Sequence, residues 1–134
     1  MAYPIRHTQS PTTHNLAYDK NGDDVIQLAF EVDNDTLEAA VESIRALKML
    51  GSNISMPNKT VVHKYLDEVD EAAKLCGAIN TVVNTRDKDG NVTGYLKGYN
   101  TEDGSHRDWL SSNRYRSTRR TGRHCRAAYL QYQR

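Results

Sequence analysis

Cysteine, proline, tryptophan and phenylalanine are scarce in this chain, and the scarcity excludes several classes of protein. Its 134 residues include two cysteines, three prolines, one tryptophan and one phenylalanine. Cys76 and Cys125 are too few for a disulfide scaffold and too far apart in sequence for a metal-binding knuckle. We therefore expect a reducing, cytoplasmic setting, and the spacing of the histidines predicts no metal site.

Long apolar runs and glycine-rich turns are also missing. No stretch approaches the ~20 apolar residues of a membrane-spanning helix. The first residues lack the basic and then apolar pattern of a signal peptide, so we expect no membrane partner. The eight glycines nowhere form a G-x-G-x-x-G pattern, and without it the sequence predicts neither a Rossmann dinucleotide domain nor cofactor-binding residues.

The charges and the aliphatic residues divide the chain into two regions. Residues 1–104 hold 10 basic and 16 acidic residues and 22 Val, Ile or Leu. Residues 105–134 hold eight arginines, one acid and two leucines. We therefore predict one folded domain over 1–104 and an Arg-rich tail over 105–134. The abrupt change in composition indicates that the tail is disordered or frame-shifted, apart from a short helical stretch over 127–132.

Residues 1–104 alternate strand-like and helix-like patterns. Strands are expected over 2–5, 25–32, 53–55 and 78–84, with a hairpin turn at Asp89-Gly90 and a return strand over 92–97. Helices are expected over 10–21, 37–50, 58–66 and 70–76, the first capped by Ser10 and the second by a capping box of Asp35 and Glu38. This alternation of strands and helices predicts an α/β fold, with a mostly parallel sheet, crossover helices and a C-terminal β-hairpin.

Polar side chains follow the expected strands, where ligands of open α/β sheets bind. They are Thr8, Ser10, Ser55, Lys59, Asn80, Asn100, Thr101, Glu102 and Asp103. Hydroxyls and amides suit a polyhydroxylated ligand, and a lysine held by a carboxylate can transfer a proton. Simpler interpretations stay open, because Ser10 can be only a helix cap, Lys59 a surface lysine and the segment 100–104 a turn.

Four segments, Pro4–Pro11, Ile54–Lys59, Gly77–Thr81 and Gly98–Thr101, together resemble the motifs of one enzyme family, the shikimate dehydrogenases. Pro4–Pro11 is similar to their Pro-Ile-x-His-Ser-x-Ser-Pro, and Ile54–Lys59 to their Val-Thr-x-Pro-x-Lys. Gly77–Thr81 is similar to Gly-Ala-x-Asn-Thr, and Gly98–Thr101 to the start of Gly-x-Asn-Thr-Asp. Two segments, Ala29-Phe30-Glu31-Val32-Asp33 and Ser55-Met56-Pro57-Asn58-Lys59, favour the quinate/shikimate branch of the family. The resemblance covers about residues 1–104.

The resemblance implies the substrate-binding and catalytic domain of an enzyme that oxidises shikimate or quinate with NAD or NADP. Thr8 and Ser10 would then hold the substrate carboxylate, Ser55 and Asn80 would bind ring hydroxyls, and Asn100 would also contact the substrate. Lys59 would be the acid/base, paired with Glu102 or Asp103. In the family a separate Rossmann domain binds the dinucleotide.

The chain departs from the family pattern in its first strand, which is truncated, at Thr8, and at Glu102-Asp103, where one residue is added. Because the nucleotide domain is not recognisable, we expect little turnover by this chain and self-association through the exposed interdomain surface. The alternative is a non-catalytic ligand-binding or interaction module. In that alternative, the arginines of the tail and Tyr115, Tyr129 and Tyr132 could bind nucleic acid. The simpler interpretation of the tail is a disordered, solvated segment that binds no nucleic acid.

Overall fold

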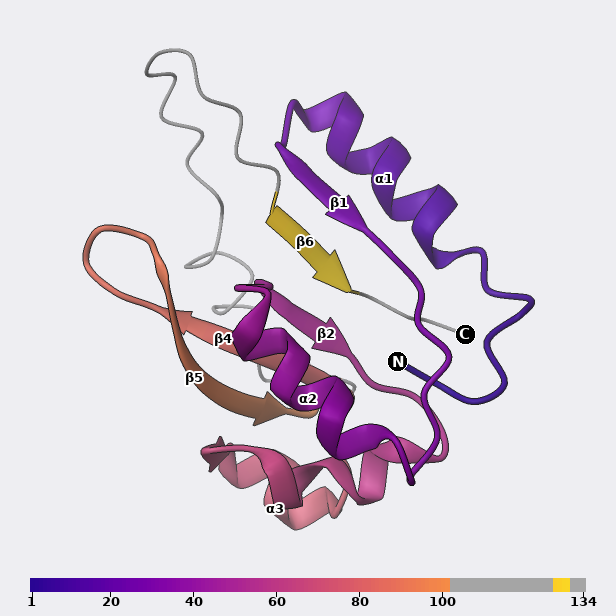
Figure 1. Ribbon diagram of the computed structural model, residues 1–134, viewed down its shortest axis with the longest axis vertical. Helices are drawn as coiled ribbons and strands as arrows, with labels where there is room; N and C mark the ends of the chain where they lie inside the picture. The colour runs from indigo at the N-terminus through magenta and orange to yellow at the C-terminus, as the bar shows by residue number, and fades with distance from the viewer. Residues whose placement is uncertain (102–126, 131–134) are drawn as a thin grey trace.

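The computed structural model describes residues 1–101 and the strand Ala127–Leu130, which together form one mixed sheet with helices on both faces (Figure 1). The strands are β1 (Val25–Gln27), β2 (Gly51–Asn53), β3 (Glu68–Val69), β4 (Thr81–Arg86), β5 (Val92–Tyr99) and β6 (Ala127–Leu130). The helices are α1 (Ser10–Asn21), α2 (Leu37–Ala46) and α3 (Glu71–Cys76), with 3₁₀ turns η1 (Asn58–Thr60) and η2 (Val62–Tyr65).

The sheet is mixed, which corrects the prediction of a mostly parallel one. Its order is β1-β6-β2-β4-β5-β3. β6 runs parallel to β1 and β2, and β3 parallel to β5, but β4 is antiparallel to both β2 and β5. The prediction was wrong because strand-like and helix-like patterns reveal elements but not strand direction, which depends on where each connection ends.

The β4–β5 hairpin forms as predicted. Asp87 organises the turn, since its Oδ1 accepts the backbone N–H groups of Asp89 and Asn91, both at 2.9 Å. On the other side of β4, Gly51 of β2 lies so close that a Cβ there would be 2.2 Å from the carbonyl oxygen of Val82. Only glycine fits at this position, where two backbones meet.

Helix α1 spans the predicted residues, but its start differs. Ser10 is the first helical residue rather than the cap; the cap position is Gln9, and no side chain caps it. The hydroxyl oxygen of Thr8 instead accepts the N–H of Ser10 at 3.2 Å. Gly22 ends the helix in a left-handed conformation, as expected.

Helix α2 is shorter than predicted and lacks the expected capping box. It ends at Ala46, and Thr36 occupies its cap position without a side-chain bond to the N–H groups of the helix. The Asp33 carboxylate satisfies Thr36 instead, accepting its N–H at 2.9 Å and its hydroxyl at 2.7 Å.

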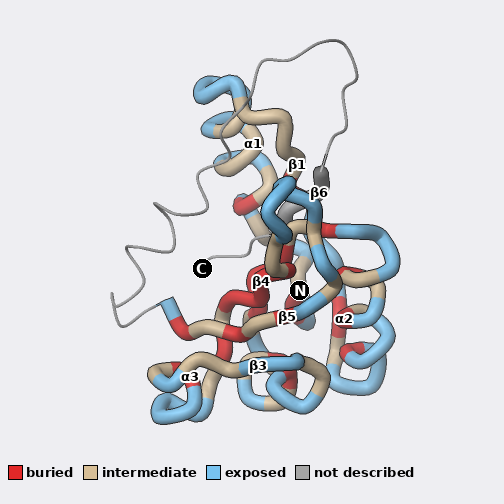
Figure 2. Tube along the Cα trace, turned by 90° about the vertical axis from the view of Figure 1, so that its left-hand side faces the viewer, coloured by how far each residue is buried: buried red, intermediate tan, exposed pale blue. Residues whose placement is uncertain are grey.

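The inner face of α2 supplies much of the hydrophobic core. Figure 2 shows α2 on one side of the sheet, α1 and α3 on the other, and buried residues concentrated between them. The core consists of Met1, Val32, Leu37, Val41, Ile44, Met49, Ile54, Val62, Ala73, Ile79, Val82 and Leu96.

The segment after β2 forms two 3₁₀ turns rather than the single predicted helix over 58–66. Helix α3 is confirmed, one residue shorter than predicted, and Gly77 ends it as expected. Asp70 is its N-cap rather than its first residue, and the Asp70 carboxylate accepts the N–H of Ala72 at 3.1 Å. These short elements matter for function, because η1 carries Lys59 and the end of α3 leads directly to Asn80.

Several predicted segments have different structures. The strand expected over 2–5 is reduced to a single bridge at Ala2, and the strand expected over 53–55 lies earlier, as β2. The strand expected over 25–32 is only three residues long, followed by a single bridge between Glu31 and Ala2. Residues 127–130 form a strand, whereas a helical stretch was expected. Glu102, Asp103, Tyr115 and Tyr132 lie outside the described residues.

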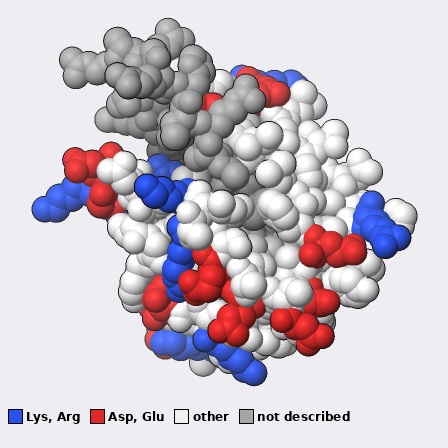
Figure 3. All heavy atoms as spheres, in the orientation of Figure 1, with Lys and Arg blue, Asp and Glu red and all other residues white. Residues whose placement is uncertain are grey.

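Charged side chains of both signs lie beside one another on the face drawn in Figure 3. Arg45 connects three elements: its guanidinium donates to Asp67 at 2.9 Å and to the carbonyl oxygens of Gly94 and Tyr65 at 3.0 and 3.3 Å. Lys97 pairs with Glu68 at 2.6 Å. Among the described residues, no helix is long and apolar enough to cross a membrane.

Candidate functional site

Backbone hydrogen bonds bring three predicted site segments together at one edge of the sheet. The N–H of Ile54, just beyond β2, donates to the carbonyl of Asn80 at 2.8 Å. The N–H of Ile79 donates to the carbonyl of Lys59 at 2.9 Å. Because β4 is antiparallel to β2 and β5, the start of β4 lies beside the ends of both strands. Ser55, Lys59 and Asn80 therefore belong to one neighbourhood.

The side chain of Asn80 is held in one orientation by hydroxyl and amide donors. Its Oδ1 accepts the Thr81 hydroxyl at 2.9 Å, the Thr101 N–H at 3.0 Å and the Thr101 hydroxyl at 3.1 Å. Three donors saturate the two lone pairs of an amide oxygen. Only the NH₂ group of Asn80 is therefore left to bind a ligand, and it is a hydrogen-bond donor.

Asn100 packs beside Asn80 and is itself buried, with 8% of its surface exposed. Its Oδ1 accepts the Asn80 NH₂ at 3.4 Å, and its own NH₂ donates to the carbonyl of Ala78 at 3.2 Å. Each amide NH₂ carries two hydrogens. Asn80 thus presents an N–H group beside Asn100, which suits the oxygen of a hydroxylated ligand.

Lys59 is anchored through its neighbour Asn58. The Asn58 side chain is fully buried, and its NH₂ donates to the carbonyl of Val32 at 2.8 Å. The N–H of Asn58 donates to the carbonyl of Ser55 at 2.9 Å. These bonds fix the turn η1, while the Ser55 hydroxyl makes no hydrogen bond within the described part of the chain and can bind a ligand.

Thr8 and Ser10 form a hydroxyl pair at the start of α1. Thr8 Oγ1 accepts the Ser10 N–H, which leaves the Thr8 hydroxyl hydrogen available as a donor. His14, one turn later, lies with Nδ1 2.8 Å from the carbonyl of Ser10. The chain before Thr8 runs beside the Ser55 segment, since Tyr3 N–H donates to the carbonyl of Met56 at 3.1 Å.

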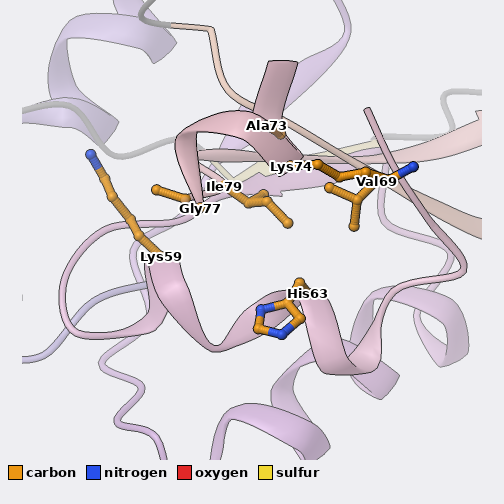
Figure 4. A pocket seen from close by; sticks show the side chains of 8 residues that line it. Lys59, His63, Val69, Ala73, Lys74, Gly77 and Ile79 are labelled. Atoms are coloured by element: carbon orange, nitrogen blue, oxygen red, sulfur yellow. The ribbon is translucent and has the colours of Figure 1, made fainter. Parts of the chain in front are cut away.

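A cavity of about 370 Å³ adjoins this site on the side of η2 and α3 (Figure 4). Its walls are Lys59, His63, Val69, Ala73, Lys74, Gly77, Ala78 and Ile79. In Figure 4 the Lys59 ammonium group points away from His63, and Lys74 pairs with Glu71 at 2.6 Å. Of the predicted site residues that the structure describes, Lys59 lines the cavity, whereas Thr8, Ser10, Ser55, Asn80 and Asn100 do not.

An ion pair and burial set the protonation of three groups on β5 and the neighbouring β3. The hydrogen bond from Lys97 to Glu68 raises the pKa of Lys97 and lowers the pKa of Glu68. Burial raises the pKa of the Tyr99 phenol, and the nearby Lys97 partly opposes that effect. At neutral pH Lys97 and Glu68 are therefore charged and Tyr99 is neutral.

Sequence reasoning named most of the polar groups in this neighbourhood, Thr101 included, but it assigned no orienting role to any of them and did not single out Thr81 or Asn58. Thr81 and Thr101 fix Asn80, and Asn58 fixes the turn of Lys59. The signal was present as two Asn-Thr dipeptides, 80–81 and 100–101. The proposed carboxylate partners of Lys59, Glu102 and Asp103, lie outside the described residues.

Taken together, the fold and the site define an α/β domain that presents hydroxyls, amide donors and a lysine at one sheet edge. Comparison with known proteins agrees with this class. The family model for the shikimate dehydrogenase substrate binding domain matches residues 1–82. The chain belongs to the shikimate dehydrogenase family.

Several relatives share this part of the chain. A quinate/shikimate dehydrogenase of Escherichia coli strain SMS-3-5 is 52% identical over 106 residues, which are 79% of this chain and 34% of the relative. The chain therefore spans about a third of the length of the curated relatives it matches.

Solved structures show the same fold. Shikimate 5-dehydrogenase of Listeria monocytogenes, in complex with shikimate and NAD, is 46% identical with a TM-score of 0.68, over 83% of this chain and 36% of that one. The Thermus thermophilus enzyme, in complex with NADP(H) and shikimate, is 27% identical with the same TM-score of 0.68, over 83% of this chain and 40% of that one.

Proposed function

We propose that this chain binds shikimate or quinate as the substrate-binding half of an NAD(P)-dependent dehydrogenase. The observation that carries the proposal is the orientation of Asn80. With its oxygen saturated by Thr81 and Thr101, it offers only N–H groups, beside Lys59 and the available hydroxyl of Ser55. A ring hydroxyl that accepts from Asn80 is held by the same chain segments that hold the lysine.

Each site residue then has a defined task. Thr8 and Ser10 bind the substrate carboxylate through hydroxyl donors, and Ser55, Asn80 and Asn100 bind the ring hydroxyls. Lys59 exchanges a proton with the hydroxyl at the carbon that is oxidised, because loss of that proton must accompany loss of the hydride. Glu102 or Asp103 would hold the lysine in its charged form.

The dinucleotide supplies the hydride acceptor in relatives of this family, but the described residues do not fit it. A pyrophosphate site needs a glycine-rich turn that leads from a strand into a helix. Within 1–101, the α-helices follow Gln9, Thr36 and Asp70 rather than a glycine. We therefore assign substrate binding and proton transfer to these residues and expect no hydride transfer by the 134-residue chain on its own.

The direct test is titration of the full chain with shikimate, followed by amide NMR shifts, with quinate in parallel. We expect shifts at Thr8, Ser10, Ser55 and Asn80, and weaker binding for Lys59→Met. The matched control is Lys64→Met, since Lys64 is an exposed lysine on η2 a few residues away. Absence of shifts at millimolar ligand, or equal loss of binding in both lysine variants, would refute the proposal.

Substrate analogues separate the two halves of the site. Cyclohexanecarboxylate keeps the carboxylate and lacks the ring hydroxyls. We expect it to shift the amides near Thr8 and Ser10 but not those near Asn80 and Asn100. The reverse pattern would contradict the assignment of the hydroxyl pair to the carboxylate.

A further inference from the structure

The helix–strand unit formed by α1 and β1 is attached to the rest of the sheet through a strand position between β1 and β2. We call this position the β1–β2 slot. Asn15 fastens α1 to β1, since its side chain exchanges two hydrogen bonds with the backbone of Gln27, at 3.0 and 2.6 Å. β1 itself is an edge strand whose neighbour in the sheet is β6.

Two separate pieces of the chain lie in the β1–β2 slot and run in the same direction. β6 pairs in parallel with β1, Ala127 facing Val25 and Tyr129 facing Gln27, and with β2, Leu130 facing Ser52. In Figure 1, β6 lies between β1 and β2, and the start of the chain lies beyond its arrowhead.

The second piece is Met1–Ala2. Ala2 forms a parallel bridge with Glu31, because its N–H donates to Phe30 and its carbonyl accepts from Val32 at 3.4 and 3.0 Å. Met1 does the same on the other side: its nitrogen donates to Asn53 at 2.7 Å and its carbonyl accepts from Ser55 at 3.0 Å. In a parallel ladder these bonds place Met1 opposite Ile54.

The registers of the two pieces agree on both sides of the slot. On the β1 side, continuing the β1–β6 register by one residue places Leu130 opposite residue 28. The bridge between Ala2 and Glu31 places Met1 opposite residue 30. Along β2, Leu130 faces Ser52 and Met1 faces Ile54. One residue position separates the two pieces on either side, so they follow the line of a single continuous strand.

We propose that the β1–β2 slot is a strand-binding site, occupied within the same molecule by Ala127–Leu130 in the register above. Main-chain hydrogen bonds on both edges provide the affinity, as in other cases where a peptide adds a strand to a sheet. With Ala127–Leu130 in place, Gln27 of β1 and Ser52 of β2 are fully buried. The strand pairs with the backbone along both edges of the slot, and backbone groups buried there without partners would be costly. Docking of Ala127–Leu130 joins the α1–β1 unit to the sheet.

Disulfide trapping in the full chain tests the register and the occupant. In a chain carrying Cys76→Ser and Cys125→Ser, Ile26→Cys and Ala128→Cys face one another. Neighbouring strands lie ~4.8 Å apart, within the ~4.4–6.8 Å that a disulfide spans between Cα atoms. We expect a disulfide within the monomer. The matched control joins Val25→Cys with Leu130→Cys, three register positions apart, and should stay reduced.

The other outcomes contradict the proposal. A disulfide-linked dimer would assign the slot to a second copy of the chain, trapping of both pairs alike would show no fixed register, and trapping of neither would remove Ala127–Leu130 from the slot.

Hydrogen exchange gives a second measurement should the cysteine variants fail to fold. Ala128→Pro in the full chain removes an N–H that a strand needs. Amides of β1 and of Gly51–Asn53 should then exchange about ten-fold faster, as expected for loss of one backbone hydrogen bond. The β4–β5 amides serve as an internal reference. An added peptide with the sequence of residues 126–134 should restore protection, whereas the same peptide with proline at position 128 should not. Unchanged exchange in the variant, or equal effects of both peptides, would overturn the proposal.

Discussion

Replacing Asn80 tests whether its side-chain oxygen organises the site. In Asn80→Ala the hydroxyl of Thr81, a residue only 3% exposed, loses its acceptor. A buried donor left without a partner costs ~1–3 kcal/mol. The donors of Thr101 are exposed and regain water, so they add little. We therefore expect the free energy of unfolding to fall by about 2 kcal/mol.

Asn80→Asp is the informative companion, because a carboxylate keeps the acceptor and replaces the NH₂. The three donors from Thr81 and Thr101 retain their partner. The bond lost is the one to Asn100, which at 3.4 Å is long and therefore weak. We expect a stability change below about 1 kcal/mol at neutral pH, together with loss of shikimate binding, since a donor becomes a negatively charged acceptor.

Urea denaturation followed by circular dichroism measures both effects. With a slope of ~1.5 kcal/mol/M for a domain of this size, the midpoint of Asn80→Ala should fall by about 1 M and the slope should stay constant. Asn34→Ala is the control, since Asn34 is exposed and makes no side-chain bond within residues 1–101. The reasoning fails if Asn80→Ala matches the control, or if Asn80→Asp is destabilised as strongly as Asn80→Ala.

Three further predictions concern the scaffold. Ile44→Ala, in the fully buried face of α2, should lower the free energy of unfolding by ~2–5 kcal/mol; Leu47→Ala, 66% exposed one turn later, should change it by less than ~0.5 kcal/mol in the same urea titration. The hydrogen bond from the Leu96 N–H, and then Arg45, lowers the pKa of Asp67, so its stabilisation is present at neutral pH and lost as pH falls through that lowered value. Asp67→Asn should therefore be less stable than the parent chain at pH 7, by about 1 kcal/mol after allowing for solvent screening. Urea midpoints of the two chains should converge below about pH 4, and a constant gap would contradict the mechanism. Burial, with the charge of Asp23, raises the pKa of Tyr18 to about 12, so the ultraviolet titration of Tyr18→Phe should lack one late-ionising phenol.

Local signals in the sequence determined those features whose bonds are made within a few residues. Asp70 and Gly77 bracket α3 because a carboxylate satisfies free N–H groups at one end and glycine adopts the left-handed conformation at the other. The hairpin turn at 87–91 follows from the bonds that Asp87 makes to its own neighbours. The motifs around Thr8, Lys59, Asn80 and Asn100 also sufficed to indicate the family.

Features that depend on distant parts of the chain were decided only by the tertiary structure. The direction of β4, the donors from Thr101 to Asn80, and the placement of β6 beside β1 all join residues far apart in sequence. A residue pattern records how each segment packs and bonds locally; which segments meet, and in which direction, depends on the burial of the whole core.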